Sequence, residues 1–93
     1  MNKRTVHFCA RGQVQGVGYR AFVETNASQL DVDGWVRKRR NGSVEAVFQG
    51  KPDDVAALIE RCRKGPAAAL VTCVDVCEVN DDVGMGFNVL PTA

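Results

Sequence analysis

The chain has 93 residues, with twelve Lys and Arg against eleven Asp and Glu, so its formal net charge is +1. This length suits one small domain over residues 1–93, and the balanced charge excludes a protein that binds polyanions through a large basic excess. No apolar run approaches ~18 residues and no apolar signal region follows Met1–Arg4, so we expect a soluble, cytoplasmic protein.

The first two predicted elements are a strand and a helix. Polar and apolar residues alternate from Arg4 to Arg11, which is typical of a half-buried strand with His7 on its solvent-facing side. From Arg20 to Asp31 the apolar residues recur at i, i+4 and i+7, which predicts a helix lying on a sheet. The segment between these two elements therefore joins a strand to a helix.

That connecting segment, Gln13–Arg20, has the composition of an anion-binding loop. Gly16 and Gly18 allow successive backbone N–H groups to turn inward and form a concave nest for phosphate or carboxylate oxygens. The start of the helix adds its positive end, and Arg20 adds a planar guanidinium that can bind two oxygens at once. The alternative interpretation is a structural turn in which Arg20 begins the helix and pairs with a surface carboxylate.

The rest of the chain predicts further strands and a second helix. Three strands follow from alternating or β-branched runs: Val32–Lys38, Ser43–Gly50 and Val71–Val79. Asn41-Gly42 suits the turn between the first two of these strands, because both residues tolerate positive φ. Pro52 suits the start of a helix that Gly65-Pro66 ends, and Phe87–Leu90 is expected to form a short edge strand.

The resulting order β, α, β, β, α, β predicts an α+β fold of the ferredoxin-like (split βαβ) kind. Right-handed crossovers place both helices on one face of an antiparallel four-stranded sheet. Neither a linker nor a repeat interrupts the order, so we expect a single domain.

The four cysteines do not form a recognisable metal or disulfide motif. They are Cys9, Cys62, Cys73 and Cys77. None belongs to a C-x-x-C pair, and Cys73 and Cys77 in one strand lie about 13 Å apart at ~3.3 Å per residue. We therefore expect no metal and no cofactor, and interpret the cysteines as small buried apolar side chains in a reducing compartment.

Three blocks of sequence resemble the acylphosphatase family, and the resemblance covers essentially the full length. The blocks are Gly12-x-Val14-Gln15-Gly16-Val17-Gly18-Tyr19-Arg20, then Gly34-Trp35-Val36 with Gly42-x-Val44-Glu45, and finally Gly65-Pro66. The resemblance implies a metal-free hydrolase that converts acyl phosphates to a carboxylate and inorganic phosphate. It also implies that backbone N–H groups hold the phosphoryl oxygens together with the Arg20 guanidinium. The residues that supply these N–H groups are Gln15, Gly16, Val17, Gly18 and Tyr19.

One expected catalytic residue departs from the family pattern. Acylphosphatases carry an asparagine that orients the attacking water where this chain has Lys38. An amide can donate and accept hydrogen bonds, whereas an ammonium group only donates them. The chain is therefore either an acylphosphatase of reduced activity, with Arg20 and Lys38 as catalytic residues, or a catalytically weakened domain that binds phosphate or acyl phosphate.

Arg37–Arg40 is the only basic run, and it permits three interpretations. It is a solvated hairpin tip, a rim that steers anionic substrates, or part of an RNA-binding surface on a ferredoxin-like sheet. RNA binding is the least favoured, because Phe8 and Phe48 fall on inward faces and leave no aromatic stacking platform. We expect an acyl phosphate and inorganic phosphate as small-molecule partners, no nucleic acid, no membrane, and a monomer.

Overall fold

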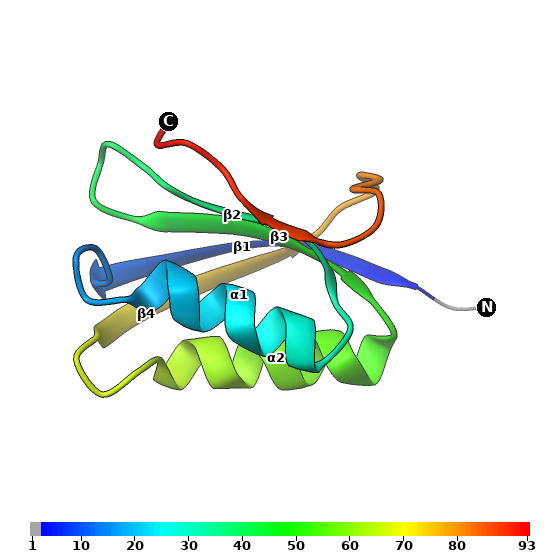
Figure 1. The fold of residues 1–93 in the computed structure, drawn as a ribbon, viewed down its shortest axis with the longest axis horizontal. Helices are drawn as coiled ribbons and strands as arrows, with labels where there is room; N and C mark the ends of the chain where they lie inside the picture. The colour runs from blue at the N-terminus through cyan, green and yellow to red at the C-terminus, as the bar shows by residue number, and fades with distance from the viewer. Residues whose placement is uncertain (1–2) are drawn as a thin grey trace.

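The computed structural model describes residues 3–93, which form two layers, a sheet and a pair of helices (Figure 1). The elements are β1 (Arg4–Gln13), α1 (Tyr19–Gln29), β2 (Asp33–Lys38), β3 (Val44–Gly50), α2 (Pro52–Lys64), β4 (Leu70–Glu78) and β5 (Phe87–Val89). The ferredoxin-like order is confirmed. The expectation that no apolar signal region follows Met1–Arg4 also involves Met1 and Asn2. These two residues lie outside the described residues. Within residues 3–93, no helix has the length and apolar character needed to cross a membrane.

The sheet has the strand order β4-β1-β3-β2-β5. Its first four strands pair antiparallel, as predicted. The expectation of a wholly antiparallel sheet is wrong, because β5 runs parallel to β2 with Gly34 opposite Phe87. The Gly34 N–H donates to the Gly86 carbonyl at 3.0 Å, and the Gly86 N–H donates to Asp33 Oδ1 at 2.9 Å. These two bonds fix the returning chain beside the start of β2.

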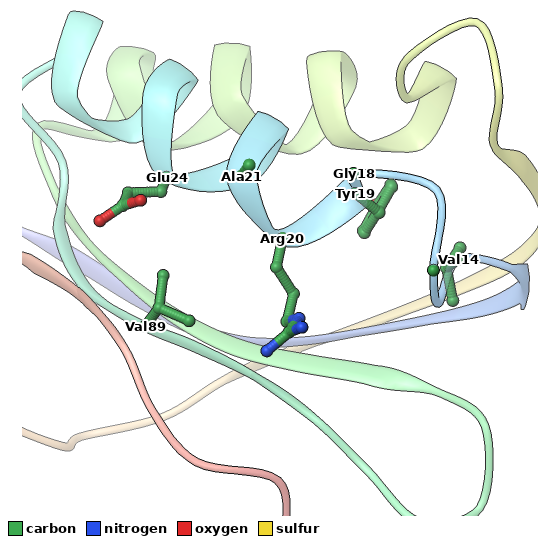
Figure 2. A pocket seen from close by; sticks show the side chains of 8 residues that line it. Val14, Gly18, Tyr19, Arg20, Ala21, Glu24 and Val89 are labelled. Carbon is green, nitrogen blue, oxygen red and sulfur yellow. The ribbon is translucent and has the colours of Figure 1, made fainter.

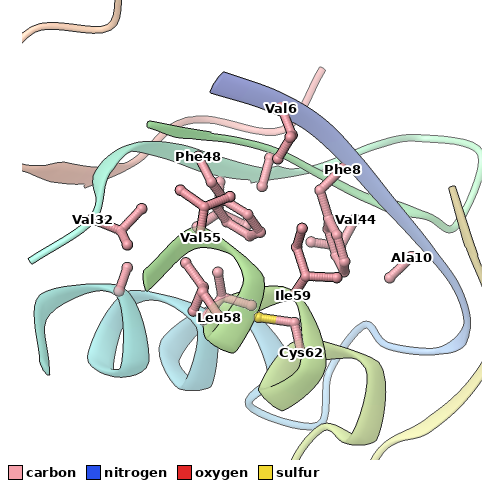
Figure 3. Close-up of a cluster of buried hydrophobic side chains, with 14 of the residues drawn as sticks. Val6, Phe8, Ala10, Val32, Val44, Phe48, Val55, Leu58, Ile59 and Cys62 are labelled. Atoms are coloured by element: carbon pink, nitrogen blue, oxygen red, sulfur yellow. The ribbon is translucent and has the colours of Figure 1, made fainter. Parts of the chain in front are cut away.

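Both helices cover the same face of the sheet, and the core lies between the layers (Figures 1 and 3). Phe8 from β1 and Phe48 from β3 are fully buried, with ring centroids 5.2 Å apart. The i, i+3, i+4, i+7 spacing on α2 predicts a buried stripe, and the residues on that stripe are all buried: Val55, Leu58, Ile59 and Cys62. Neither of the two helices in the described residues covers the opposite face of the sheet.

The interpretation of all four cysteines as buried side chains is wrong. Cys62 is buried, but Cys9 is only half-buried, and Cys73 and Cys77 are exposed. The strand register explains the difference, because Cys77 pairs with His7 on the uncovered face while the neighbouring Val76 pairs with the core residue Phe8. β-Branched runs predict a strand but not which of its faces another layer covers.

Candidate active site

The loop between β1 and α1 has the backbone of an anion-binding nest. Gly16 and Gly18 have φ of 72° and 78°, the left-handed region that residues with a Cβ seldom adopt. Gly18 is the N-cap of α1, and no side chain of residues 3–93 caps this end of the helix. The N–H groups of the first helical turn therefore have no side-chain partner and are available to an anion.

Three side chains hold this loop in place. Val14 is buried, and the buried Tyr19 hydroxyl donates to the Cys62 carbonyl of α2 at 2.6 Å. Burial also raises the pKa of Tyr19, so the hydroxyl stays protonated as a donor. Gln15 Nε2 donates to the carbonyls of Arg39 at 2.7 Å and Ser43 at 3.0 Å. Gln15 and Tyr19 thus use their side chains as anchors, which leaves only their backbone for a ligand.

A pocket of about 270 Å³ opens beside the loop. Its lining residues are Val14, Gly16, Gly18, Tyr19, Arg20, Ala21, Glu24 and Val89. Figure 2 shows the Arg20 side chain extending from α1 toward the sheet, with Val89 on one side and the loop on the other. Arg20 is half-buried, and among residues 3–93 its guanidinium forms no salt bridge. The alternative in which Arg20 pairs with a surface carboxylate is therefore wrong.

The pocket contains some of the residues predicted for the site and omits others. Those that line it are Gly16, Gly18, Tyr19 and Arg20, whereas those that do not are Gln15, Val17 and Lys38. Sequence reasoning missed Glu24 and Val89. Glu24 lies one helical turn after Arg20, and this i, i+4 spacing is a signal that could have found it. Val89 had no such signal, because its place depends on the parallel pairing of β5.

Lys38 shares the end and the face of the sheet on which the loop lies. It is the last residue of β2 and is half-buried, and alternation with the fully buried Val36 places it on the helix-covered face. Val44 of β3 pairs with Lys38 on one side and with Ala10 of β1 on the other. The Lys38 carbonyl also accepts a hydrogen bond from the Ala93 N–H at 3.0 Å, which fixes the end of β2 to the C-terminal segment.

Two arginines of the basic run form ion pairs on the uncovered face of the sheet. Arg37 Nε and Arg39 Nη1 donate to Glu45 Oε1 at 2.8 and 2.9 Å, and His7 Nε2 lies 2.6 Å from Glu45 Oε2. Burial alone would raise the pKa of Glu45, but the bonds from His7, Arg37 and Arg39 outweigh it and lower that pKa to about 2. For these two arginines the interpretation as a solvated tip is wrong, and His7 does not simply face solvent.

Acid is expected to destabilise the fold through Glu45. Its pKa falls from an ordinary 4.5 to about 2 on folding, so the stabilisation is complete above pH 4.5 and is lost as the pH falls toward 2. The shift corresponds to about 3 kcal/mol of unfolding free energy. In urea unfolding, the wild type should lose about this much more stability between pH 5 and pH 2 than Glu45→Gln. Equal losses would contradict the role of Glu45, and Glu60→Gln, at an exposed ion pair, is the control.

Comparison with known proteins identifies the family of this chain. The family model described as "Acylphosphatase" matches residues 6–89. The chain belongs to the acylphosphatase family. It is 52% identical to an acylphosphatase of Rhodopseudomonas palustris (strain BisB18), over 88% of this chain and 89% of that protein. It is 44% identical to one of Bradyrhizobium diazoefficiens, over 99% of both chains.

A solved acylphosphatase structure has the same fold as this chain. The acylphosphatase from Coxiella burnetii superposes with a TM-score of 0.91 at 34% identity, and the match covers 96% of this chain and 94% of that one. Because the family match includes both the loop and β2, Arg20 and Lys38 lie within the acylphosphatase domain.

Proposed function

We propose that this acylphosphatase-family chain hydrolyses acyl phosphates to a carboxylate and inorganic phosphate. The backbone N–H groups of residues 15–19 and the Arg20 guanidinium would hold the phosphoryl oxygens. The observation that supports this most directly is Arg20 itself: a half-buried guanidinium without a carboxylate partner among residues 3–93, beside an uncapped helix start. A dianionic phosphoryl group supplies the charge that this arrangement lacks.

The chemistry requires little beyond positioning and charge stabilisation. Water attacks phosphorus, the bond from phosphorus to the acyl oxygen breaks, and the leaving carboxylate is already a stable anion. Phosphoryl transfer places charge on the equatorial oxygens, and fixed N–H donors and a guanidinium stabilise that charge without reorganising. Neither a nucleophilic side chain nor a metal is required for such a substrate.

Lys38 is the part of the site that limits the rate. Its ammonium group can donate to phosphoryl oxygens or to the oxygen of the attacking water, but it cannot accept the proton of that water. A donor that binds substrate and transition state equally strengthens binding without raising kcat. Family membership favours an enzyme over a domain that only binds phosphate, so we propose an active acylphosphatase with slow turnover.

Two features of the fold bear on the partners and on the cellular compartment of the protein. Phe8 and Phe48 are buried in the core, so the sheet does not present them for base stacking, and we propose that nucleic acid is not a partner. Cys73 and Cys77 are exposed free thiols, which suits a reducing cytoplasm.

Two measurements on the wild-type protein test the proposal together. Benzoyl phosphate should be consumed faster with the protein than in buffer alone, and inorganic phosphate should raise the melting temperature. A ligand that binds only the native state at about 100 times its Kd adds about 2.7 kcal/mol of stability. If phosphate stabilises the protein but benzoyl phosphate survives, the chain is a binding domain. If neither effect appears, the proposed site is wrong.

A further inference from the structure

The two edges of the sheet differ in how they are protected. At the β2 edge lie the three-residue strand β5 and the residues that follow it, since Leu90 N–H donates to the Val36 carbonyl at 2.9 Å. At the other edge, within the described part of the chain, β4 pairs only with β1 and runs for nine residues, Leu70–Glu78, without a proline or lysine. Natural proteins commonly use those residues to block pairing at an exposed edge. Between Cys73 and Cys77, β4 therefore presents a regular edge that no proline, lysine or bulge interrupts.

Hydrogen bonding between β1 and β4 shows which backbone groups of β4 are free. The Val79 N–H donates to the Thr5 carbonyl at 3.0 Å, which makes Thr5 and Val79 a hydrogen-bonded pair. Such pairs alternate along an antiparallel ladder, so Asp75 turns its N–H and C=O toward β1. Its neighbours Val74 and Val76 turn theirs outward, where they can pair with another strand.

The sequence of β4 is close to a palindrome. Residues 71–79 read Val-Thr-Cys-Val-Asp-Val-Cys-Glu-Val, which is nearly symmetric about Asp75. An antiparallel pair of identical strands has a two-fold axis, so each residue meets its mirror position in the second copy. With the axis at Asp75, Val74 lies opposite Val76 of the second copy and Cys73 lies opposite Cys77. The outward backbone groups of Val74 and Val76 then face each other.

The charge at this axis is compensated within each chain. The two Asp75 carboxylates would repel each other if they were unpaired. Arg11 Nη1 already lies 2.9 Å from Asp75 Oδ2, on the uncovered face of the sheet. Two copies therefore bring two aspartates and two arginines together, and each carboxylate gains a second cation nearby.

We propose that the β4 edge pairs antiparallel with the β4 edge of a second copy about Asp75, forming a reversible dimer with one continuous sheet. This proposal replaces the expectation of a monomer. The contact involves one strand from each chain, a small interface that favours exchange between monomer and dimer. It does not depend on catalysis, because neither Val74 nor Val76 lines the pocket that contains Arg20.

Sedimentation under reducing conditions tests the backbone pairing. The average mass should rise from 10.1 kDa toward twice that value as protein concentration is raised. Val76→Pro removes an outward N–H without breaking a bond to β1, so this variant should remain monomeric at every concentration. Val76→Thr keeps both the shape and the N–H, and should associate like the wild type. A wild type that stays at 10.1 kDa throughout would overturn the proposal.

Cysteine complementation tests the register even if Val76→Pro fails to fold. In a Cys9→Ser background, diamide should link Cys73 of one chain to Cys77 of the other, taking up the two electrons and two protons that the thiols release as the S–S bond forms. Cys73→Ser alone and Cys77→Ser alone should each give no crosslinked dimer. Mixing the two variants should restore it, because Cys77 of one then faces Cys73 of the other. Equal crosslinking by either variant alone would show random collision and overturn the register.

Discussion

Replacing Arg20 with alanine is expected to reduce kcat/KM for benzoyl phosphate by a factor on the order of 10³ or more. Two charged side chains line the pocket beside the loop, the guanidinium of Arg20 and the carboxylate of Glu24, and of these only Arg20 is positively charged. Its loss leaves the backbone N–H groups of the loop and the Lys38 ammonium group to stabilise the charge of the transition state. Phosphate should also cease to raise the melting temperature, because the same group binds the product.

Two further variants separate the role of Arg20 from general damage. Arg20→Lys keeps the charge but not the two-pronged geometry, so it should recover only part of the activity. Arg63→Ala removes an exposed arginine that pairs with Glu60 on α2, and should leave hydrolysis unchanged. Full activity in a folded Arg20→Ala protein would remove Arg20 from the mechanism and require another phosphoryl-binding group.

Lys38→Asn is expected to raise kcat for acyl phosphate hydrolysis by about 10²–10³, the usual effect of one well-placed polar group at a reacting centre. The amide can bond to the attacking water through both its donor and its acceptor, which the ammonium group cannot do. The hydrogen bond from the Ala93 N–H to the carbonyl of residue 38, and the register of residue 38 with Val44, do not involve the side chain, so the asparagine should occupy the same place. Steady-state kinetics with benzoyl phosphate measure the change.

Comparison variants identify the cause of any increase. Lys38→Met removes the charge and supplies no amide, so it should not reproduce the gain. Arg40→Asn places the amide at an exposed position two residues later and should leave kcat unchanged. A Lys38→Asn protein slower than the wild type would mean that the ammonium group itself advances the reaction, which would overturn the orienting argument.

The conformation of the loop between β1 and α1 could be predicted from the sequence because its determinants are local. Glycines at positions 16 and 18 specify a backbone that other residues disfavour, and their place between a strand and a helix puts Arg20 in the first turn. Lys38 could be predicted only through the family pattern. Its side chain reaches the same face as the loop because β1, β3 and β2 align Ala10, Val44 and Lys38 in one row.

Other features of the site depend on contacts between distant segments. Glu45 binds three basic side chains, from β1, from β2 and from the residue that follows β2, and no spacing in the sequence indicates that Arg37 and Arg39 share one carboxylate. Val89 reaches the pocket because β5 lies at the β2 edge. Two hydrogen bonds of the Gly86 backbone, to the Gly34 N–H and to Asp33 Oδ1, hold the chain at that edge.

The sequence by itself determined the order of elements, the positive-φ glycine loop before α1 and the family, because periodicity, glycine φ preferences and short motifs act over a few residues. Only the tertiary structure decided which cysteines are exposed, that Glu45 pairs with two arginines of the basic run, and which edge of the sheet stays open. These properties depend on which strands become neighbours, and pairing between strands is set by packing and register across the whole sheet rather than by any one segment.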